Sequence, residues 1–259
     1  MPAAPSLSEE DLQNVLALMK GADSVELKLT VPDSSQVSTV RTLGVDPLDA
    51  QIRQVFFFDT PNLDLSEKGV VVRARRVQGR SADTTVKLRP VQPDALPPDL
   101  RARPTFGVEV DAMPGGYVCS GSLKAKVTND AVRAVAAGDA TLKKLMSKEQ
   151  RTLYAEHAPE GIALDDLAML GPVFVLKASF TPPDFGRRLV TELWLYPDGS
   201  RILELSTKCA PSEAFQVAAE AKAFLGSHGV ELGGEQHTKT KAALEFYARE
   251  LTAGAAVSG

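Results

Sequence analysis

Residues Ser24–Val31 read SVELKLTV, which alternates charged and aliphatic side chains over the length of one β-strand. Successive side chains of a strand point to opposite faces, so Glu26 and Lys28 share one face and the aliphatic residues share the other. The same alternation recurs in four further predicted strands, at residues 70–76, 84–89, 107–111 and 201–207. One such strand is typical of a protein surface. Five of them indicate a sheet with one whole face of charged side chains of both signs.

Two arrangements of this sheet are open. An ordinary sheet buries its apolar face and exposes the polar one, which is adequate for any single strand. The set fits that arrangement less well, because its alternate positions are nearly all Arg, Lys, Glu or Asp rather than Thr, Ser or Gln. A closed barrel would instead place the charges inside and the aliphatic side chains outside, covered by helices.

The side chains that would point into such a barrel can be named by alternation. The basic ones are Lys28, Arg73, Arg75, Lys87, Arg89, Lys177 and Lys208, and the acidic ones are Glu26, Glu109, Asp111, Glu192 and Glu204. Buried charges need partners or water, and this set has about two positive charges in excess. A polyanion carrying a divalent metal would complete it, because Arg and Lys bind phosphate oxygens and carboxylates bind Mg²⁺ or Mn²⁺.

Composition sets limits on the function. The chain has 259 residues, 44% hydrophobic and 24% charged, and a net charge of −4, so the surface as a whole does not favour nucleic-acid binding. The two cysteines lack metal-type spacing and predict no disulfide, which favours a reducing compartment. No signal peptide and no apolar run of about 18 residues is apparent. We therefore expect a cytoplasmic protein without a membrane span.

The order of predicted elements indicates an α+β fold. A helix from Ser8 to Lys20 precedes about eight strands, and helices at 212–228 and 238–251 follow them. We predict an N-terminal helix with a loose tail over 1–22, one domain over 23–252 with a helical insert at 112–170, and a frayed tail at 253–259. Ser147 and Gln150 form a capping-box pattern at the start of a helix in the insert.

In their order along the chain, these motifs resemble the CYTH superfamily, also called triphosphate tunnel metalloenzymes. The matching segments are SVELK at 24–28, FFDTP at 57–61, RAR at 73–75, KLR at 87–89, EVD at 109–111, DG at 198–199, ELSTK at 204–208 and TKTK at 238–241. The resemblance spans roughly residues 23–250, without the insert. It implies a closed eight-stranded antiparallel β-barrel with flanking helices. The implied activities are hydrolysis of tripolyphosphate, thiamine triphosphate or nucleoside triphosphates, or adenylate cyclase chemistry, with Mg²⁺ or Mn²⁺ as cofactor.

The resemblance also implies roles for the inward set. The seven basic residues would bind the phosphates, and Lys28 would also contact the transferred phosphoryl group or orient the attacking water. The five acidic residues would bind the metal. The alternative for Arg73, Arg75, Lys87 and Arg89 is a solvated sheet face. For Lys28 and the acidic residues it is ion pairing within the barrel. The partner would be a triphosphate-containing small molecule or polyphosphate, bound by a monomer or homodimer, with no nucleic acid or membrane.

Two positions depart from the family pattern. Ser24 stands where the opening motif has its first Glu, and Ser206 stands where the last strand often has its second. A hydroxyl is a poor substitute for a carboxylate at a hard cation, so the metal site is expected to be weakened. The phosphate-binding set is intact, which leaves two hypotheses: a metal-dependent triphosphatase, or a module that binds triphosphate or polyphosphate without cleaving it.

Overall fold

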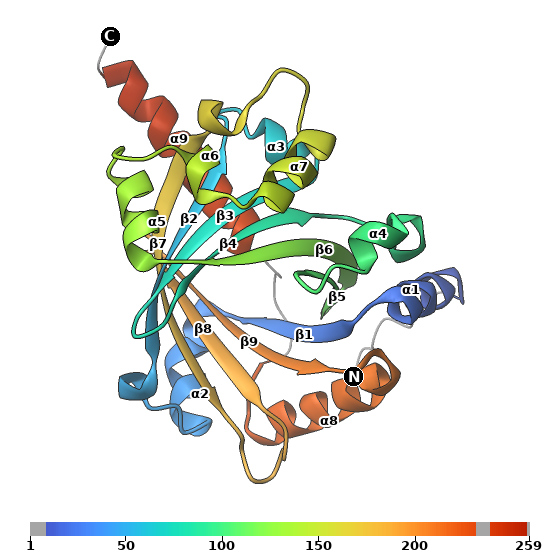
Figure 1. Cartoon of the computed structure of the whole chain (residues 1–259). Helices are drawn as coiled ribbons and strands as arrows, with labels where there is room; N and C mark the ends of the chain where they lie inside the picture. Colours follow the sequence, from blue (N-terminus) through green and yellow to red (C-terminus); the bar gives the residue numbers. More distant parts are fainter. Residues whose placement is uncertain (1–8, 232–238, 258–259) are drawn as a thin grey trace.

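The computed structural model describes residues 9–231 and 239–257, which form a closed β-barrel flanked by helices (Figure 1). The strands follow the order β1-β5-β6-β4-β3-β2-β7-β8-β9 around the barrel. The predicted α+β class and closed barrel are therefore confirmed. The predicted starts of the first helix at Ser8 and of the last helix at Thr238 lie outside the described residues.

The strands of the described chain are β1 (Ser24–Val31), β2 (Gln51–Asp59), β3 (Val70–Val77), β4 (Ala82–Leu88), β5 (Phe106–Met113), β6 (Gly116–Val127), β7 (Ala168–Phe180), β8 (Leu189–Leu195) and β9 (Arg201–Cys209). The helices are α1 (Glu9–Gly21), α2 (Gln36–Thr42), α3 (Asp64–Glu67), α4 (Pro98–Arg101), α5 (Asn129–Ala136), α6 (Leu142–Leu145), α7 (Lys148–His157), α8 (Ala214–Ser227) and α9 (Lys239–Val257).

The barrel differs from the predicted one in strand number and direction. It has nine strands rather than eight, and it is mixed, because β1 and β5 run parallel while the other pairs are antiparallel. The added strand is β6, whose residues 116–127 fall within the stretch that we predicted to be a helical insert. Its sequence, GYVCSGSLKAKV, is rich in small and polar residues and weak in strand-forming pattern. A tight hairpin with β5 compensates, since Met113 pairs with Gly116 across it.

The helical part of the insert is shorter than expected. Helices α5, α6 and α7 occupy residues after β6, and β7 begins at Ala168, before the predicted end of the insert. The capping box at the start of α7 is present, with Ser147 accepting from the backbone of Gln150 and Gln150 from that of Ser147. Helix α9 runs to Val257, into the tail that we expected to fray.

Two of the three apolar clusters in the described residues lie outside the barrel wall. Outward-facing aliphatic residues such as Val72, Val86 and Val108 are buried and belong to one cluster with residues from α1, α5, α6 and α7. A second cluster joins the outer faces of β1 and β9 to Phe224 and Leu225 of α8. Burial of this outer face provides the main stabilisation. The interior is therefore free to hold charge, as the closed-barrel interpretation requires.

Helix α9 closes part of the barrel from within. Its residues Ala243 and Leu244 pack with Val55, Phe57 and Trp194, whose strands also contribute side chains to the interior. No helix in residues 9–231 and 239–257 is both long and apolar enough to cross a membrane. Cys119 and Cys209 are both buried and free, as predicted.

A glycine between α3 and β3 fixes the position of a predicted phosphate ligand. Gly69 has a φ of +76°, and a Cβ placed on it would lie 2.4 Å from the backbone oxygen of Arg89. The backbone N–H of Arg89 also donates to the Gly69 oxygen at 2.8 Å. Any side chain at this position must displace the strand end that carries Arg89.

We predict that Gly69→Ala destabilises the protein more than Gly79→Ala does. Gly79 has a φ of +67° with no atom near its Cβ position, so its substitution costs only the left-handed conformation, about 1 to 2 kcal/mol. Gly69→Ala adds a backbone clash, for which we expect about 1 to 3 kcal/mol more. Urea unfolding of the two variants measures the difference. Equal losses of unfolding free energy in the two variants would show that the contact with Arg89 does not restrict the residue at position 69.

Candidate functional site

The barrel interior encloses a cavity of about 410 Å³. All twelve residues that alternation placed inside the barrel line it: Glu26, Lys28, Arg73, Arg75, Lys87, Arg89, Glu109, Asp111, Lys177, Glu192, Glu204 and Lys208. They lie on β1, β3, β4, β5, β7, β8 and β9, except Arg89, which directly follows β4. The structure thus brings the predicted set together in one space.

Four basic residues of the lining were missed. They are Arg53 on β2, Lys124 on β6, Arg188 just before β8 and Lys239 at the start of α9. Arg188 lies an even number of residues before Glu192 in the same predicted strand, so alternation places both side chains on the inner face. The sequence pattern predicts a short helix or turn at Arg53 and a helical insert at Lys124, and the structure has strands there, β2 and β6. The lining described here has eleven basic and five acidic residues, a surplus of six rather than two.

Three arginines concentrate this positive charge. Arg75 forms a 2.7 Å ion pair with Asp83, and Arg73 lies 3.5 Å from the same carboxylate. Burial and the nearby Arg75 lower the pKa of Arg53 to about 10, and they also lower the pKa of Arg73. The Nε of Arg73 is buried without a hydrogen-bond acceptor in the described structure. Crowded cations with an unused donor are suited to binding an anion.

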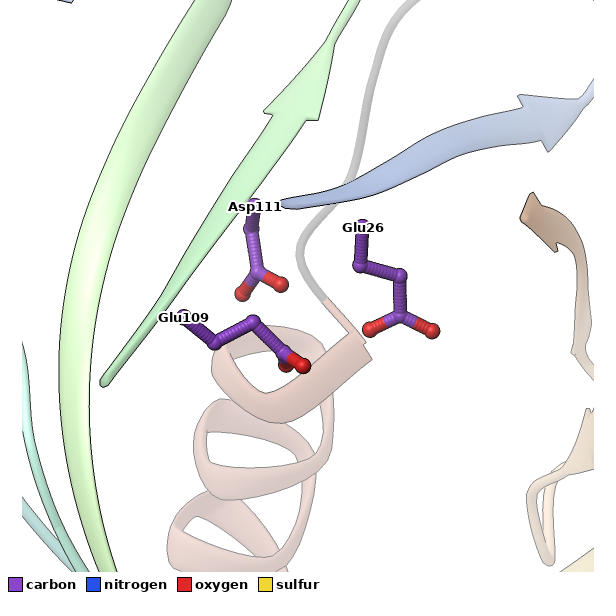
Figure 2. A group of neighbouring side chains, drawn as sticks. All are labelled: Glu26, Glu109 and Asp111. Carbon is purple, nitrogen blue, oxygen red and sulfur yellow. The ribbon is translucent and has the colours of Figure 1, made fainter. Parts of the chain in front are cut away.

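Three carboxylates gather on the neighbouring strands (Figure 2). One oxygen from each of Glu26, Glu109 and Asp111 lies within 4.8 Å of the others. The parallel pairing of β1 with β5 brings them together, because it places Glu26 beside Asp111 and Ser24 beside Glu109. We call these three residues the acidic triad.

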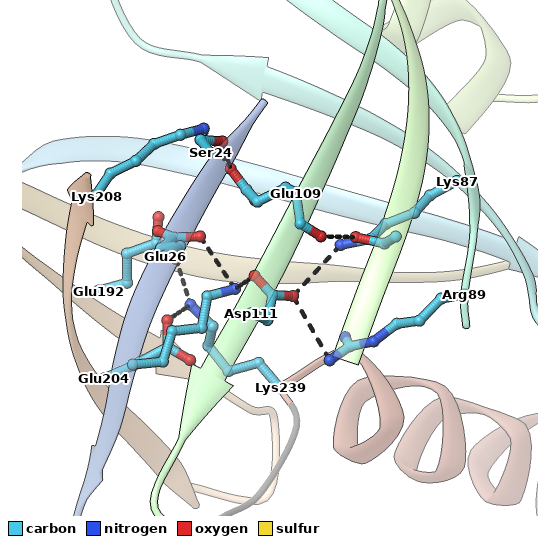
Figure 3. A network of polar contacts seen from close by, with 12 residues as sticks. Ser24, Glu26, Lys87, Arg89, Glu109, Asp111, Glu192, Glu204, Lys208 and Lys239 are labelled. Atoms are coloured by element: carbon cyan, nitrogen blue, oxygen red, sulfur yellow. Dashed lines mark hydrogen bonds and ion pairs between the residues drawn. The ribbon is translucent and has the colours of Figure 1, made fainter. Parts of the chain in front are cut away.

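Basic side chains surround the acidic triad (Figure 3). Lys28 Nζ lies 2.8 Å from Asp111 and 3.1 Å from Glu26, and Lys208 pairs with Glu109. Burial alone would raise the pKa of Asp111, but Lys28 and Lys87 together lower it. Burial would likewise lower the pKa of Lys28, but Asp111 and Glu26 outweigh this and raise it. Both groups therefore stay charged near neutral pH.

The acidic triad is suited to a hard divalent cation. Its donors are carboxylate oxygens, the ligands that Mg²⁺ and Mn²⁺ prefer. Asp111 is almost fully buried, and its Oδ1 lies 2.8 Å from Lys28 Nζ, whereas its Oδ2 has long contacts with Lys87 and Arg89, at 3.6 and 3.5 Å. A loosely contacted carboxylate oxygen beside two further carboxylates fits a metal site.

The other two predicted metal ligands lie in a separate group. Glu192 accepts from Lys177 at 2.8 Å and from Lys239 at 2.5 Å, and Lys239 also reaches Glu204 at 2.7 Å. Burial would raise the pKa of Glu192, but Lys239 and Lys177 hold it well below its usual range. These two carboxylates already have cationic partners from the chain itself.

The two serines occupy the positions at which carboxylates were expected. Ser24 Oγ donates to Glu109 Oε2 at 3.4 Å, so this position borders the acidic triad. Ser206 is buried on β9 and pairs with Lys28 across the β1–β9 ladder. A glutamate at Ser24 would add a fourth carboxylate to the triad.

Comparisons with known proteins bear on the fold. No family model matches the chain, and no curated protein matches it in sequence. It is similar in structure to a Hippeastrum protein, an adenylyl cyclase candidate reported with a dominant triphosphatase activity, with 19% identity and a TM-score of 0.59 over 82% of this chain and 91% of that one. It is also similar to an adenylate cyclase candidate from Bacillus halodurans, with 11% identity and a TM-score of 0.58 over 85% of this chain and 97% of that one. The fold is thus the one that the CYTH resemblance implied.

Lys87 makes the stability of the protein depend on pH. Burial, together with Lys28 and Arg89, lowers its pKa to about 8 in spite of the attraction of Asp111. Between about pH 8 and the ordinary lysine value of about 10.4, the unfolded chain binds a proton that the folded chain does not. The free energy of unfolding must therefore rise with pH over this window.

We predict that wild type gains about 1 to 2 kcal/mol of stability relative to Lys87→Met between pH 7 and pH 9.5. The variant lacks the titrating amine, so all other groups cancel in the difference. Urea unfolding at several pH values measures it. Parallel pH profiles for the two proteins would contradict the assigned pKa.

Proposed function

We propose that the chain is a divalent-metal-dependent triphosphatase that hydrolyses a phosphoanhydride bond inside its barrel. The observation that carries this proposal is a single cavity lined by eleven basic residues and, on its β1–β5 wall, by the acidic triad. Phosphoryl transfer needs little beyond positioning and charge stabilisation, and this cavity offers both. The triphosphatase activity reported for the Hippeastrum protein supports it.

The basic residues have the task of binding and aligning the substrate. Arg53, Arg73 and Arg75 offer forked donors on one part of the wall, and Lys87 and Arg89 offer donors beside Asp111. Arg binds phosphate through two parallel hydrogen bonds, which fixes orientation as well as charge. A triphosphate held across both groups would have its anhydride oxygens between the arginines and the acidic triad.

Glu26, Glu109 and Asp111 would hold Mg²⁺ or Mn²⁺. Such an ion would neutralise charge on bridging phosphate oxygens and lower the pKa of bound water. Lys28 lies against two of these carboxylates and keeps its proton, so it does not act as a general base. We assign it to stabilising negative charge on the transferred phosphoryl group, or to orienting the attacking water.

The cavity favours inorganic tripolyphosphate over nucleoside or thiamine triphosphates. Trp194 is the one aromatic residue in the described lining. Its ring stacks on Phe57 with centroids 6.4 Å apart, and Lys239 Nζ lies 5.2 Å from its centroid. Both neighbours limit access to its π-face, so a base or thiazole ring has no stacking platform there. The same observation argues against an adenylate cyclase, which must hold adenine.

We predict that the protein releases phosphate from tripolyphosphate with Mg²⁺ or Mn²⁺, and that Arg73→Ala lowers kcat/KM by roughly 100-fold or more. Arg76→Ala is the matched control: Arg76 is on the same strand, but hydrogen-bonds Gln54 on the outer face and does not line the cavity. A malachite-green assay measures release. No release from tripolyphosphate, ATP or thiamine triphosphate with either metal would refute the proposal.

The second candidate function is a binding module that holds a triphosphate or polyphosphate without cleaving it. Ser24 and Ser206 favour it, since each removes a carboxylate that the resemblance implied. Under this hypothesis the arginine and lysine contacts alone provide the affinity. The two functions therefore differ in whether the bound triphosphate is cleaved with the help of a metal ion. Both predict that the barrel binds the anion.

We predict that tripolyphosphate raises the melting temperature even in EDTA, because ligand binding to the native state stabilises it without metal. An unchanged melting temperature would exclude the binding module. The double variant Ser24→Glu with Ser206→Glu separates the two functions. Hydrolysis that appears only in this variant would assign the wild type to binding, whereas hydrolysis by wild type supports the enzyme.

A further inference from the structure

Lys239 occupies an unusual place for a lysine. It lies on α9, and its side chain is only 11% exposed. It enters the barrel beside Trp194, and its Nζ lies between two carboxylates from different strands, 2.5 Å from Glu192 Oε2 and 2.7 Å from Glu204 Oε1. The two ion pairs offset the cost of burial.

The group around Lys239 differs from the acidic triad in being saturated. Both oxygens of Glu192 accept hydrogen bonds, Oε1 from Lys177 and Oε2 from Lys239 and, at 3.3 Å, from Trp194 Nε1. Two carboxylates therefore face two ammonium groups. In the triad, by contrast, Lys28 reaches Asp111 Oδ1 at 2.8 Å, but Asp111 Oδ2 has only long contacts, at 3.6 Å with Lys87 and 3.5 Å with Arg89.

We propose that the ammonium group of Lys239 takes the place of a second metal ion. Glu192 and Glu204 then bind α9 instead of a metal, and the barrel holds one divalent ion fewer than its carboxylates could bind. Two carboxylates on adjacent strands, paired in register across β8 and β9, are otherwise a ready pair of ligands for a divalent ion. The ammonium between them fills that position with half the charge. This inference rests on the proposed function only in placing the first ion at the acidic triad.

The expected consequence is that removing the ammonium creates a metal site. Lys239→Met keeps the side-chain length and the helix propensity but leaves Glu192 and Glu204 without their shared cation. Lys177 still pairs with Glu192 in this variant, but one ammonium then faces two buried carboxylates, and the uncompensated charge favours binding of a cation or a proton. We therefore expect Lys239→Met to bind one more Mn²⁺ per chain than the wild type, two instead of one.

The experiment counts bound Mn²⁺ by equilibrium dialysis of the full chain without triphosphate. Lys241→Met is the matched control, since Lys241 is on the same helix, is exposed and pairs only with Glu245 in the described structure. The control should bind the wild-type number. Adding Glu204→Gln to Lys239→Met should remove the extra ion. The single tryptophan, Trp194, reports where that ion binds, because Mn²⁺ next to Glu192 should quench its emission in Lys239→Met more than in Lys241→Met.

An unchanged Mn²⁺ count in folded Lys239→Met would overturn the inference. If that loss of charge instead weakens tripolyphosphate binding without adding an ion, Lys239 belongs to the phosphate-binding set. Should Lys239→Met fail to fold, Glu204→Gln alone decides: it should keep the wild-type count, and loss of an ion would show that Glu204 already binds metal. If the acidic triad does not bind the first ion, Glu109→Gln leaves the wild-type Mn²⁺ count unchanged. This result tests the proposed metal site separately from the role of Lys239.

Discussion

The dominant constraint on this protein is the burial of charge inside a closed β-barrel. An isolated charge in such a place is costly, so every buried group must have a counter-charge, water or a ligand. Asp111 is at the centre of this balance, with Lys28, Lys87 and Arg89 around it. A surplus of basic residues remains after internal pairing, and under the proposed function a polyanion would balance it.

In an ordinary β-sheet protein the apolar side chains point into the core, whereas here the charged side chains point into the barrel. The rest of the fold follows from this difference. Because the interior is charged, the apolar core must form between the outer wall of the barrel and the helices, and α1, α5, α7 and α8 supply its second layer. Closure of the barrel by the parallel β1–β5 pair has a direct chemical result. It places Glu26 beside Asp111 and so assembles the acidic triad.

Helix α9 connects the fold to the chemistry. Its apolar residues pack against the interior ends of β2 and β8, and its first residue places an ammonium between Glu192 and Glu204. The five acidic residues that line the cavity therefore have two different tasks. Three form a site suited to a metal, and two anchor a helix. The pairing also brings Lys239 Nζ to 5.2 Å from the centroid of the Trp194 ring.

The sequence by itself determined twelve of the charged side chains that line the barrel, because the period of a strand is two and alternation assigns each residue to a face. It also indicated the closed barrel, since so many charges on one face need enclosure or a ligand. Strand β6 was not predictable, because its small and polar residues carry little strand signal and its pairing with β5 and β4 decides its structure. Neither was the division of the acidic residues. Which carboxylate meets which cation depends on strand register and on where α9 enters, and these are set by contacts between residues far apart in the chain.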